Sequence, residues 1–407
     1  MKQVRFASQE FQRLINRQNG RSRIVERVRK IVEGVRTHGD EGVIRFTRQF
    51  DKVRLTPKQL RVTETEINGA YQNLDPKFAG WLKIISENIG HFYKRHLKKS
   101  WRTSDQNGVV LGELYRPLDR VGVYIPSGTA PLVSTVYMTI VPARLAGVSE
   151  IYVATPPRPD GSVDPHILAV AGLLKVNGVF KIGGAQAIAA MAFGTRTIPQ
   201  VDKIVGPGNL YVAEAKRQVF GHVDIDMVAG PSEVVIIANQ HCNVPFLLED
   251  LRAQAEHFMG MAVVVTPSKM LVRQLRQQTA PGFIIHTKNL NEAVDIVNRI
   301  APEHVQIMVK RPQALLRKIR HAGTVFLGPY TPTAVGDYVA GPSHVLPTGG
   351  TARFFSGLSV EDFIKRIHVI GYSRKALEAS REMIERIGTI ESMTHHVESV
   401  RVRFIDK

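Results

Sequence analysis

The segment "QAEH" places an amide and an imidazole three residues apart, at Gln254 and His257. On an α-helix, positions three apart lie on the same face, so these two side chains could reach one common point. Taken alone, the segment is more typical of a surface helix with a solvated histidine. Its chemistry therefore depends on residues elsewhere in the chain.

A second pair of reactive side chains occurs in "APEH", where Glu303 and His304 are adjacent. Histidine titrates near neutral pH and glutamate can activate a water molecule, so the two residues could act as proton-transfer groups in one site. Adjacent glutamate and histidine are common by chance. The pair is a weak signal without further residues.

The C-terminal third of the chain contributes more polar side chains. Asp337 and His344 belong to the Gly- and Pro-rich segment "VGDYVAGPSHVLPTGG", and Glu391 and His396 belong to "IESMTHHVESV". Irregular segments of this kind often carry functional residues.

These residues permit a metal site without cysteine. Cys242 is the only cysteine, which excludes an internal disulfide framework and a cysteine-based zinc site. A site of nitrogen and oxygen ligands suited to zinc, with open positions for a substrate, could form from Gln254, His257, Asp337 and His396. Their spacing alone does not establish it.

Three predicted strand ends are rich in glycine and other small residues. They are "YIPSGTAP" at 124–131, "IGGAQAIAAMAFG" at 182–194 and "VGPGNLYVAEAKR" at 205–217. Small residues between a strand and a helix let backbone N–H groups approach a phosphate or a ribose. None matches G-x-G-x-x-G, and each alone is more typical of a plain turn. The three together in one layer fit a dinucleotide cleft as well as they fit plain turns.

The elements that must position these residues form an α/β pattern. From residue 108 onward, short β-rich runs such as "GVYIP" and "EVVIIA" alternate with helical stretches. Continuous apolar strands with helices between them are typical of parallel sheets buried on both faces. We predict two α/β layers, at 108–230 and 231–359, with ligands at the carboxyl ends of their strands.

The two ends of the chain have a helical pattern. Residues 1–107 are predicted to be mainly helical, with an extended interruption near "VRLTPKQLRVTETEI". The tail, 360–407, is also predicted to be helical. The N-terminal region is expected to pack in part with the second layer.

The chain is strongly basic, with 54 Lys and Arg against 36 Asp and Glu and a net charge of +18. Its first 100 residues contain 22 basic and 10 acidic side chains. Such charge can attract nucleic acid, but no nucleic-acid motif accompanies it, so a solvated outer face is the preferred interpretation. No apolar run reaches the ~18 residues of a membrane span, and no signal peptide is evident, which favours the cytoplasm.

Seven ordered motifs give the chain a resemblance to a known family. "GGAQAIAA", "GPGN", "AGPSEV", "QAEH", "APEH", "GDY" with "SHVLPT", and "THHVESV" occur in the order seen in histidinol dehydrogenases. The resemblance implies two incomplete Rossmann-like layers. It also implies a homodimer with one Zn²⁺ per subunit that uses NAD to oxidise L-histidinol to L-histidine through the bound aldehyde, the last step of histidine biosynthesis.

The resemblance also assigns roles to residues. It implies that Glu303 and His304 are catalytic and that NAD contacts Tyr124, Gln186 and Asn209. It implies zinc ligands at Gln254, His257, Asp337 and His396, the last from the other subunit. It places the substrate against these ligands and against His304, Ser232, His344 and Glu391. In that mechanism zinc orients the imidazole of histidinol, His304 takes the hydroxyl proton, and Glu303 activates the water that adds to the aldehyde.

Two alternatives stay open. A paralogous zinc- and NAD-dependent enzyme could oxidise another small alcohol with the same metal and cofactor residues. A basic binding protein could use an inactive enzyme scaffold, although such a scaffold has no physical need of Glu303, His304 and four residues able to bind a metal.

Overall fold

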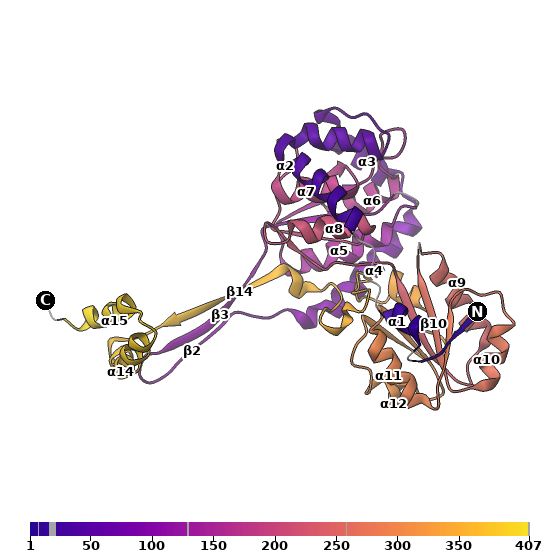
Figure 1. Cartoon of the computed structure of the whole chain (residues 1–407). Coiled ribbons are helices and arrows are strands. Elements are labelled where there is room, and N and C mark those ends of the chain that lie inside the picture. Colours follow the sequence, from indigo (N-terminus) through magenta and orange to yellow (C-terminus); the bar gives the residue numbers. More distant parts are fainter. Residues whose placement is uncertain (7, 16–21, 128–129, 258, 406–407) are drawn as a thin grey trace. The chain divides into compact units, whose positions relative to one another are not determined.

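The computed structural model describes residues 1–6, 8–15, 22–127, 130–257 and 259–405. The chain divides into two units, each described by itself (Figure 1). The larger contains Met1–Arg95 and Leu118–Phe363, and the smaller contains His96–Pro117 and Ile364–Lys407. Within the described ranges, no helix is long and apolar enough to cross a membrane.

The first sheet of the larger unit is parallel and has the strand order β6-β5-β4-β7-β8. Its strands are β4 (Arg120–Tyr124), β5 (Glu150–Thr155), β6 (Gly178–Lys181), β7 (Lys203–Val205) and β8 (Asp224–Ile225). The order reverses at β4, which pairs with β5 on one side and with β7 on the other. In open α/β sheets, this reversal leaves a crevice at the carboxyl ends of the strands, where dinucleotides bind.

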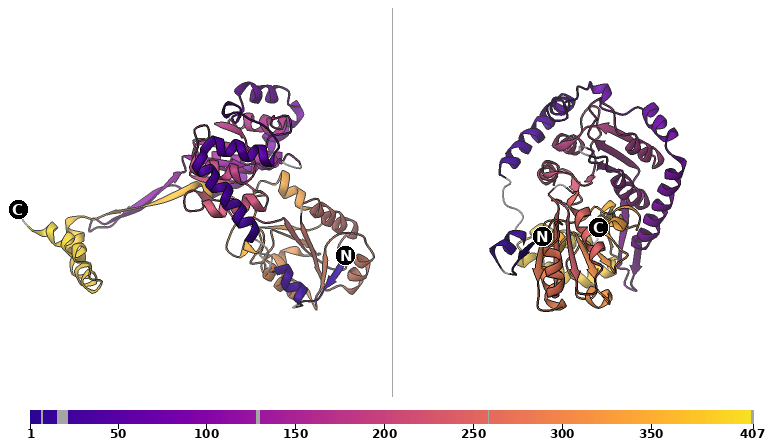
Figure 2. Two further views of the ribbon diagram at one scale, coloured as in Figure 1. Left: turned by 45° about the horizontal axis from the view of Figure 1, so that its top comes forward. Right: turned by 90° about the vertical axis from the view of Figure 1, so that its right-hand side faces the viewer.

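Helices cover this sheet and include those of the N-terminal region (Figures 1 and 2). They are α2 (Ser22–Phe50), α3 (Glu64–Gln72), α4 (Pro76–Tyr93), α5 (Val133–Ala146), α6 (Pro165–Leu173), α7 (Gly184–Phe193) and α8 (Leu210–Val219). The apolar stripe of α2, with Val28, Val32 and Val35, packs in one core with Ile188 and Met191 of α7. The N-terminal helix α2 therefore completes the first layer.

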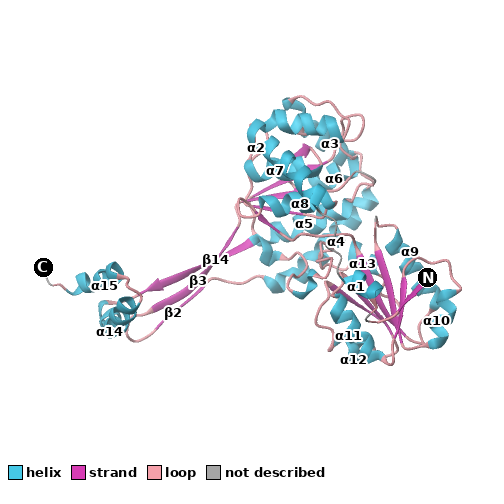
Figure 3. Ribbon diagram, viewed as in Figure 1, coloured by secondary structure: helices cyan, strands magenta, loops and turns pink. Residues whose placement is uncertain are grey.

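The second sheet is also parallel, with the order β1-β11-β10-β9-β12-β13. Its strands are β1 (Lys2–Val4), β9 (Glu233–Ala238), β10 (Met261–Thr266), β11 (Phe283–His286), β12 (His304–Met308) and β13 (Thr324–Leu327). Separate apolar cores lie on its two faces. The associated helices are α1 (Gln9–Ile15), α9 (Val244–Ala255), α10 (Lys269–Arg276), α11 (Leu290–Ile300), α12 (Pro312–Leu316) and α13 (Thr333–Tyr338). The prediction of two α/β layers with parallel sheets is confirmed, and Figure 3 shows the sheets between helices.

The prediction that the N-terminal region is helical missed β1. Lys2–Val4 pairs in parallel with Phe283–Ile285 at the edge of the second sheet. Three residues are too few to display a period of two or of 3.6, so this strand depends on a partner far away in the sequence.

The smaller unit contains an antiparallel sheet with the order β14-β3-β2 and two helices. These elements are β2 (Trp101–Ser104), β3 (Val110–Pro117), β14 (Ile364–Gly371), α14 (Arg374–Ile390) and α15 (Thr394–Arg401). The prediction of a wholly helical tail from residue 360 is therefore wrong for Ile364–Gly371. The β-branched residues of this segment favour a strand, and β3 supplies its partner.

The strand Val110–Pro117 follows the predicted boundary at residue 108 but belongs to this antiparallel sheet. The first parallel sheet begins at Arg120. The domain boundaries themselves remain a prediction.

Candidate functional site

The adjacent residues Glu303 and His304 lie at the amino edge of the second sheet. Because β9 and β12 are neighbours in the sheet, the residue before β9, Ser232, lies beside Glu303. The Ser232 hydroxyl donates to Glu303 Oε2 at 2.6 Å, and the backbone N–H of Glu233 donates to the same oxygen at 2.9 Å. In this layer the predicted position of the site, at the carboxyl ends of the strands, is therefore wrong.

His304 is oriented by the same pair of strands. Its Nδ1 lies 3.2 Å from the carbonyl oxygen of Glu233. That oxygen can only accept, so we assign the ring proton to Nδ1, which leaves the lone pair on Nε2. Nε2 lies 3.9 Å from Asp337 Oδ1. The backbone therefore fixes the tautomer in which Nε2 can take up a proton.

Burial dominates the electrostatics of these residues. It raises the pKa of Glu303 to about 8, although the Ser232 hydrogen bond and the charge of His257 oppose the shift. It lowers the pKa of His304 to about 4, against the effect of Asp337, and raises the pKa of Asp337 to about 6. At neutral pH, His304 is consequently a neutral imidazole that can act as a base.

A hollow of about 170 Å³ adjoins His304. Asp337 and His344 also line it, together with apolar side chains that include Phe326 and Leu346. His344 forms a hydrogen bond with the backbone of Ser134, and burial lowers the pKa of the His344 imidazole to about 4. Its Nε2 is buried and has no hydrogen-bond partner among the described residues. A polar ligand in the hollow could satisfy this nitrogen.

The predicted metal ligands are only partly brought together by one chain. Gln254 is buried in the last turn of α9, and its Nε2 has no partner within the described part of the chain. The helix ends at Ala255, so the prediction that Gln254 and His257 share a helix face is wrong. Instead, His257 N–H donates to the Gln254 carbonyl at 3.4 Å in a tight turn. The charge of His257 lowers the pKa of both Glu303 and His304, so the His257 side chain lies near these two residues.

Glu391 and His396 lie in the smaller unit, at the end of α14 and in α15, and both are exposed. No group of three His, Cys, Asp or Glu side chains able to hold a metal occurs among the residues that the structure describes. The donors available in the larger unit are the Gln254 amide, the His257 imidazole and the Asp337 carboxylate. A buried amide without a partner among the described residues and a partly buried carboxylate of raised pKa fit a divalent cation, and this donor set suits zinc.

The predicted NAD residues lie at the carboxyl edge of the first sheet, where the strand order reverses. Tyr124 ends β4, and its hydroxyl accepts the Gly184 N–H at 3.0 Å. Gln186, in the first turn of α7, donates from Nε2 to Asp51 Oδ2 at 3.3 Å. Asn209 caps α8 by accepting two backbone N–H groups. This edge is the position that a dinucleotide takes in such folds.

Asp51 was not among the residues predicted from the sequence. Burial raises its pKa to about 6, and it comes from the end of the N-terminal helix α2 rather than from a strand end of the sheet. No local spacing links Asp51 to Gln186, because their contact spans 135 residues.

A buried amide also connects elements that carry predicted ligands. Gln306, two residues after His304 on β12, donates from Nε2 to Asp250 Oδ2 at 2.9 Å and to the Thr331 carbonyl at 3.4 Å. Asp250 lies one helical turn before Gln254 on α9, and Thr331 lies just before α13. The only sequence signal for this contact is the helical spacing of Asp250 and Gln254.

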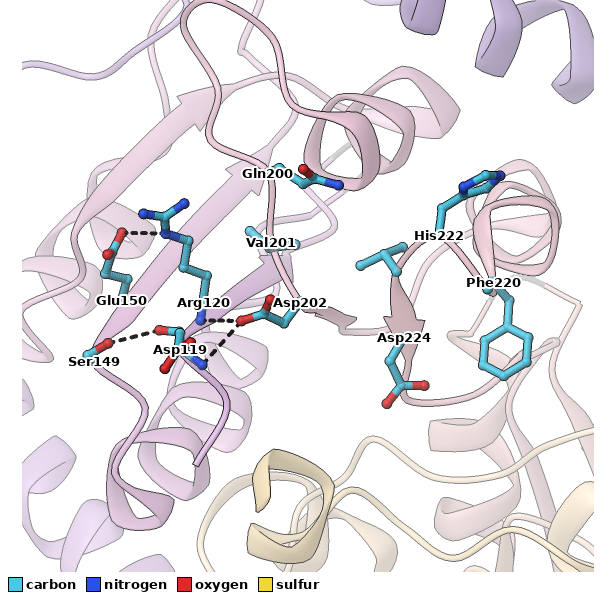
Figure 4. Close-up of a pocket in the computed structure, with 12 residues that line it drawn as sticks. Asp119, Arg120, Ser149, Glu150, Gln200, Val201, Asp202, Phe220, His222 and Asp224 are labelled. Atoms are coloured by element: carbon cyan, nitrogen blue, oxygen red, sulfur yellow. Dashed lines mark hydrogen bonds and ion pairs between the residues drawn. The ribbon is translucent and has the colours of Figure 1, made fainter. Parts of the chain in front are cut away.

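A larger hollow, of about 850 Å³, lies at the amino edge of the first sheet (Figure 4). Its principal polar side chains pair with their neighbours: Arg120 with Glu150 at 3.1 Å, and Asp202 with the backbone N–H of Arg120 at 2.8 Å. Asp224 is paired with Lys203. Because these side chains already have partners, they offer few hydrogen-bonding groups to a ligand. We therefore assign the chemistry to the site around His304 and to the carboxyl edge of the first sheet.

Comparison with known proteins finds relatives that span nearly the whole chain. The family model for histidinol dehydrogenase matches residues 15–404. A histidinol dehydrogenase of Halalkalibacterium halodurans is 44% identical over 399 residues, which cover 93% of this chain and 94% of that protein. One from Clostridium acetobutylicum is 43% identical over 414 residues, with 97% and 96% covered.

A solved structure has the same fold. The crystal structure of histidinol dehydrogenase from Elizabethkingia anophelis is 34% identical and covers 99% of this chain and 98% of its own, with a TM-score of 0.90. The fold, the order of the motifs and the extent of these matches lead to one conclusion: the chain belongs to the histidinol dehydrogenase family.

Proposed function

We propose that this protein is a zinc- and NAD-dependent histidinol dehydrogenase. It oxidises L-histidinol to L-histidine through histidinaldehyde, in two hydride transfers, as the last step of histidine biosynthesis. The observation that carries the proposal is the buried pair Glu303 and His304, with His304 lining a hollow and its Nδ1 held by the Glu233 carbonyl, in a chain of this family.

Histidinol dehydrogenases use Zn²⁺ and NAD. In this chain, zinc would be held by Gln254, His257 and Asp337, joined by the partner subunit's His396. Bound zinc would supply a Lewis acid that orients the substrate imidazole, and NAD would accept the hydride. Tyr124, Gln186 and Asn209 would contact the nucleotide.

His304 acts in each oxidation. Its Nε2 takes the proton of the substrate hydroxyl while the hydride leaves, and the Glu233 carbonyl holds the Nδ1 proton so that the ring stays in this tautomer. The lowered pKa of His304 keeps Nε2 unprotonated at neutral pH.

Glu303 acts between the two oxidations. Its carboxylate takes a proton from the water that adds to the aldehyde. The Ser232 hydroxyl and the Glu233 N–H orient one carboxylate oxygen, so that the other can face the water. Ser232 and His344 complete the substrate pocket, joined by the partner subunit's Glu391.

We also propose that the enzyme is a cytoplasmic homodimer with shared active sites. The smaller unit exposes large apolar side chains, among them Ile370 at 72%, Ile390 at 69% and Met383 at 61%. Exposed apolar patches commonly mark protein interfaces. The same unit carries Glu391 and His396, which in this proposal complete the site of the partner.

The two alternatives have less support. A paralogue acting on another alcohol would not need the particular pocket residues His344 and Glu391. A basic binding protein on an inactive scaffold would not need the buried Glu303–His304 pair with its fixed tautomer.

The decisive experiment supplies purified protein with L-histidinol and NAD and counts products. Two NADH formed per L-histidine are expected. One NADH per turnover with accumulation of the aldehyde, or no NADH above the His304→Asn variant, would contradict the proposal. Other small alcohols tested in parallel address the paralogue alternative.

A further inference from the structure

A buried ion pair lies at the carboxyl edge of the first sheet. Lys216 in α8 and Asp226, which directly follows β8, contact each other through their charged groups, and their side chains are only 3% and 1% exposed. Apolar residues of similar size can often replace such a pair without loss of stability. The charges therefore call for an explanation other than stability.

The hydrogen bonds of the pair converge on one residue, Gly206. Lys216 Nζ donates to the Gly206 carbonyl at 3.0 Å, and Asp226 Oδ2 accepts the Gly206 N–H at 2.8 Å. Asp226 Oδ1 also accepts the N–H of Met227 at 2.6 Å. Both backbone polar groups of Gly206 are thus held by buried charges.

Gly206 also lies against the end of β4. Its φ of 116° is a conformation that other residues rarely adopt, and a Cβ atom there would overlap the carbonyl oxygen of Tyr124. Asn209 follows three residues later and caps α8. Gly206 consequently sets the distance between Tyr124 and Asn209, two residues that the proposed function assigns to NAD.

We propose that Lys216 and Asp226 are positioning residues for the nucleotide cleft. They hold the Gly206 backbone, and with it the loop 206–209, at the spacing from Tyr124 that NAD requires. Both side chains are buried and act through Gly206 rather than by contact with the nucleotide. The inference rests on the proposed function, because it takes Tyr124 and Asn209 as NAD contacts.

The test compares Lys216→Met, Asp226→Asn and the double variant with the wild type. Equilibrium NAD binding is measured by calorimetry, KM is measured for NAD and for L-histidinol, and thermal unfolding is recorded. Misplacement of a group in an active site by about 1 Å can lower the reaction rate about 100-fold. We expect a comparable effect on NAD affinity, a fall of about 10- to 100-fold. The KM for L-histidinol should change much less. If a single variant fails to fold, the double variant decides, because it leaves no unpaired charge in the interior.

Asp40→Asn is the matched control. Asp40 is also buried and accepts from the hydroxyls of Thr195 and Thr197, but this contact lies after the C-terminal end of α7, away from the loop 206–209. The control should lower the unfolding temperature and leave NAD affinity unchanged. The inference is overturned if folded variants of the pair bind NAD as the wild type does, or if the KM values for NAD and L-histidinol rise equally. It is also overturned if Asp40→Asn weakens NAD binding to the same extent.

Asn209→Ala separates this inference from the proposed function. If Asn209→Ala leaves NAD affinity unchanged, the assignment of the NAD cleft fails. If it weakens NAD binding while the variants of Lys216 and Asp226 do not, only the positioning role fails.

Discussion

At the scale of single residues, the adjacent pair Glu303 and His304 divides the chemistry by position. His304 is held by the Glu233 carbonyl through Nδ1, which leaves Nε2 free of that bond, whereas Glu303 is held by Ser232 and the Glu233 N–H. One backbone segment therefore orients two neighbouring side chains for different proton transfers.

Substitution of each residue should affect different steps. His304→Asn should slow the oxidation of both histidinol and added histidinaldehyde by about 10²- to 10⁴-fold, the range for loss of a general base. Glu303→Gln should slow the second oxidation more than the first. Single-turnover measurements of NADH test this, and equal slowing of both hydride transfers by Glu303→Gln would contradict the division of roles.

The raised pKa of Glu303 predicts a pH dependence of the second oxidation. Glutamate acts on water as the carboxylate, so with a pKa of about 8 its active fraction increases as the pH rises through that value. The pKa of His304, about 4, lies below this range and adds no change there. A pH profile of histidinaldehyde oxidation should rise through about pH 8, and Glu303→Gln should abolish the rise. A flat wild-type profile would refute the assignment.

Zinc content provides a test independent of activity. His257→Ala and Asp337→Ala should each lose most of the bound metal. Loss of a residue that only supports a ligand costs about 10- to 100-fold in affinity, and loss of a ligand should cost at least as much. Metal analysis of the purified variants decides, with His395→Ala as the control, since it lies beside His396 and has no proposed role. Stoichiometric zinc in both ligand variants would reject them as ligands.

At the scale of elements, the strands of both layers other than the short β1 and β8 could be predicted from continuous apolar runs, because burial on both faces leaves few polar positions. The chemistry-bearing residues next to those strands could be located for the same reason. β14 was mistaken for a helix because its partner β3 lies some 250 residues earlier, and tertiary pairing overrides a local period. The end of α9 was misplaced because helix ends are weakly specified by sequence.

Contacts between elements were the part that the sequence could not predict. Asp51 reaches Gln186 from a helix that precedes the sheet, and Gln306 reaches Asp250 from a neighbouring strand. Neither contact has a fixed spacing along the chain. The motif residues were recognisable, whereas the residues that support them became visible only in the folded structure.

The Gln306 contact leads to a prediction about the elements it joins. Gln306→Leu should loosen α9 and the start of α13 relative to β12, and so lower zinc affinity by about 10- to 100-fold, as supporting residues do. Asn298→Ala is the control. Asn298 is also a buried amide, hydrogen-bonded to the backbone of Lys318 and Arg320, but the elements it joins carry no predicted zinc ligand. Competition with a zinc chelator measures the zinc affinity of both variants. Equal zinc affinity in the two variants would contradict the supporting role.

At the scale of the whole molecule, the proposed dimer predicts complementation between inactive variants. His257→Ala and His396→Ala should each be inactive alone. If sites are shared, a mixed dimer has one site with both changes and one with neither, so random mixing should restore about a quarter of the wild-type activity. The variants are mixed after denaturation and refolding, or are co-expressed. Absence of recovery, with mixed dimers demonstrated by differently tagged chains, would exclude sharing.

The pairing of β1 with β11 has a consequence for the order in which the protein is made. Lys2–Val4 leaves the ribosome long before Phe283–Ile285, its partner, has been synthesised. At about 5–20 residues per second, the first strand waits from about 15 to about 55 seconds for the edge on which it docks. The second sheet is therefore closed at that edge by a segment synthesised long before its partner, and during this wait β1 is the strand whose backbone has no partner and could pair with other molecules.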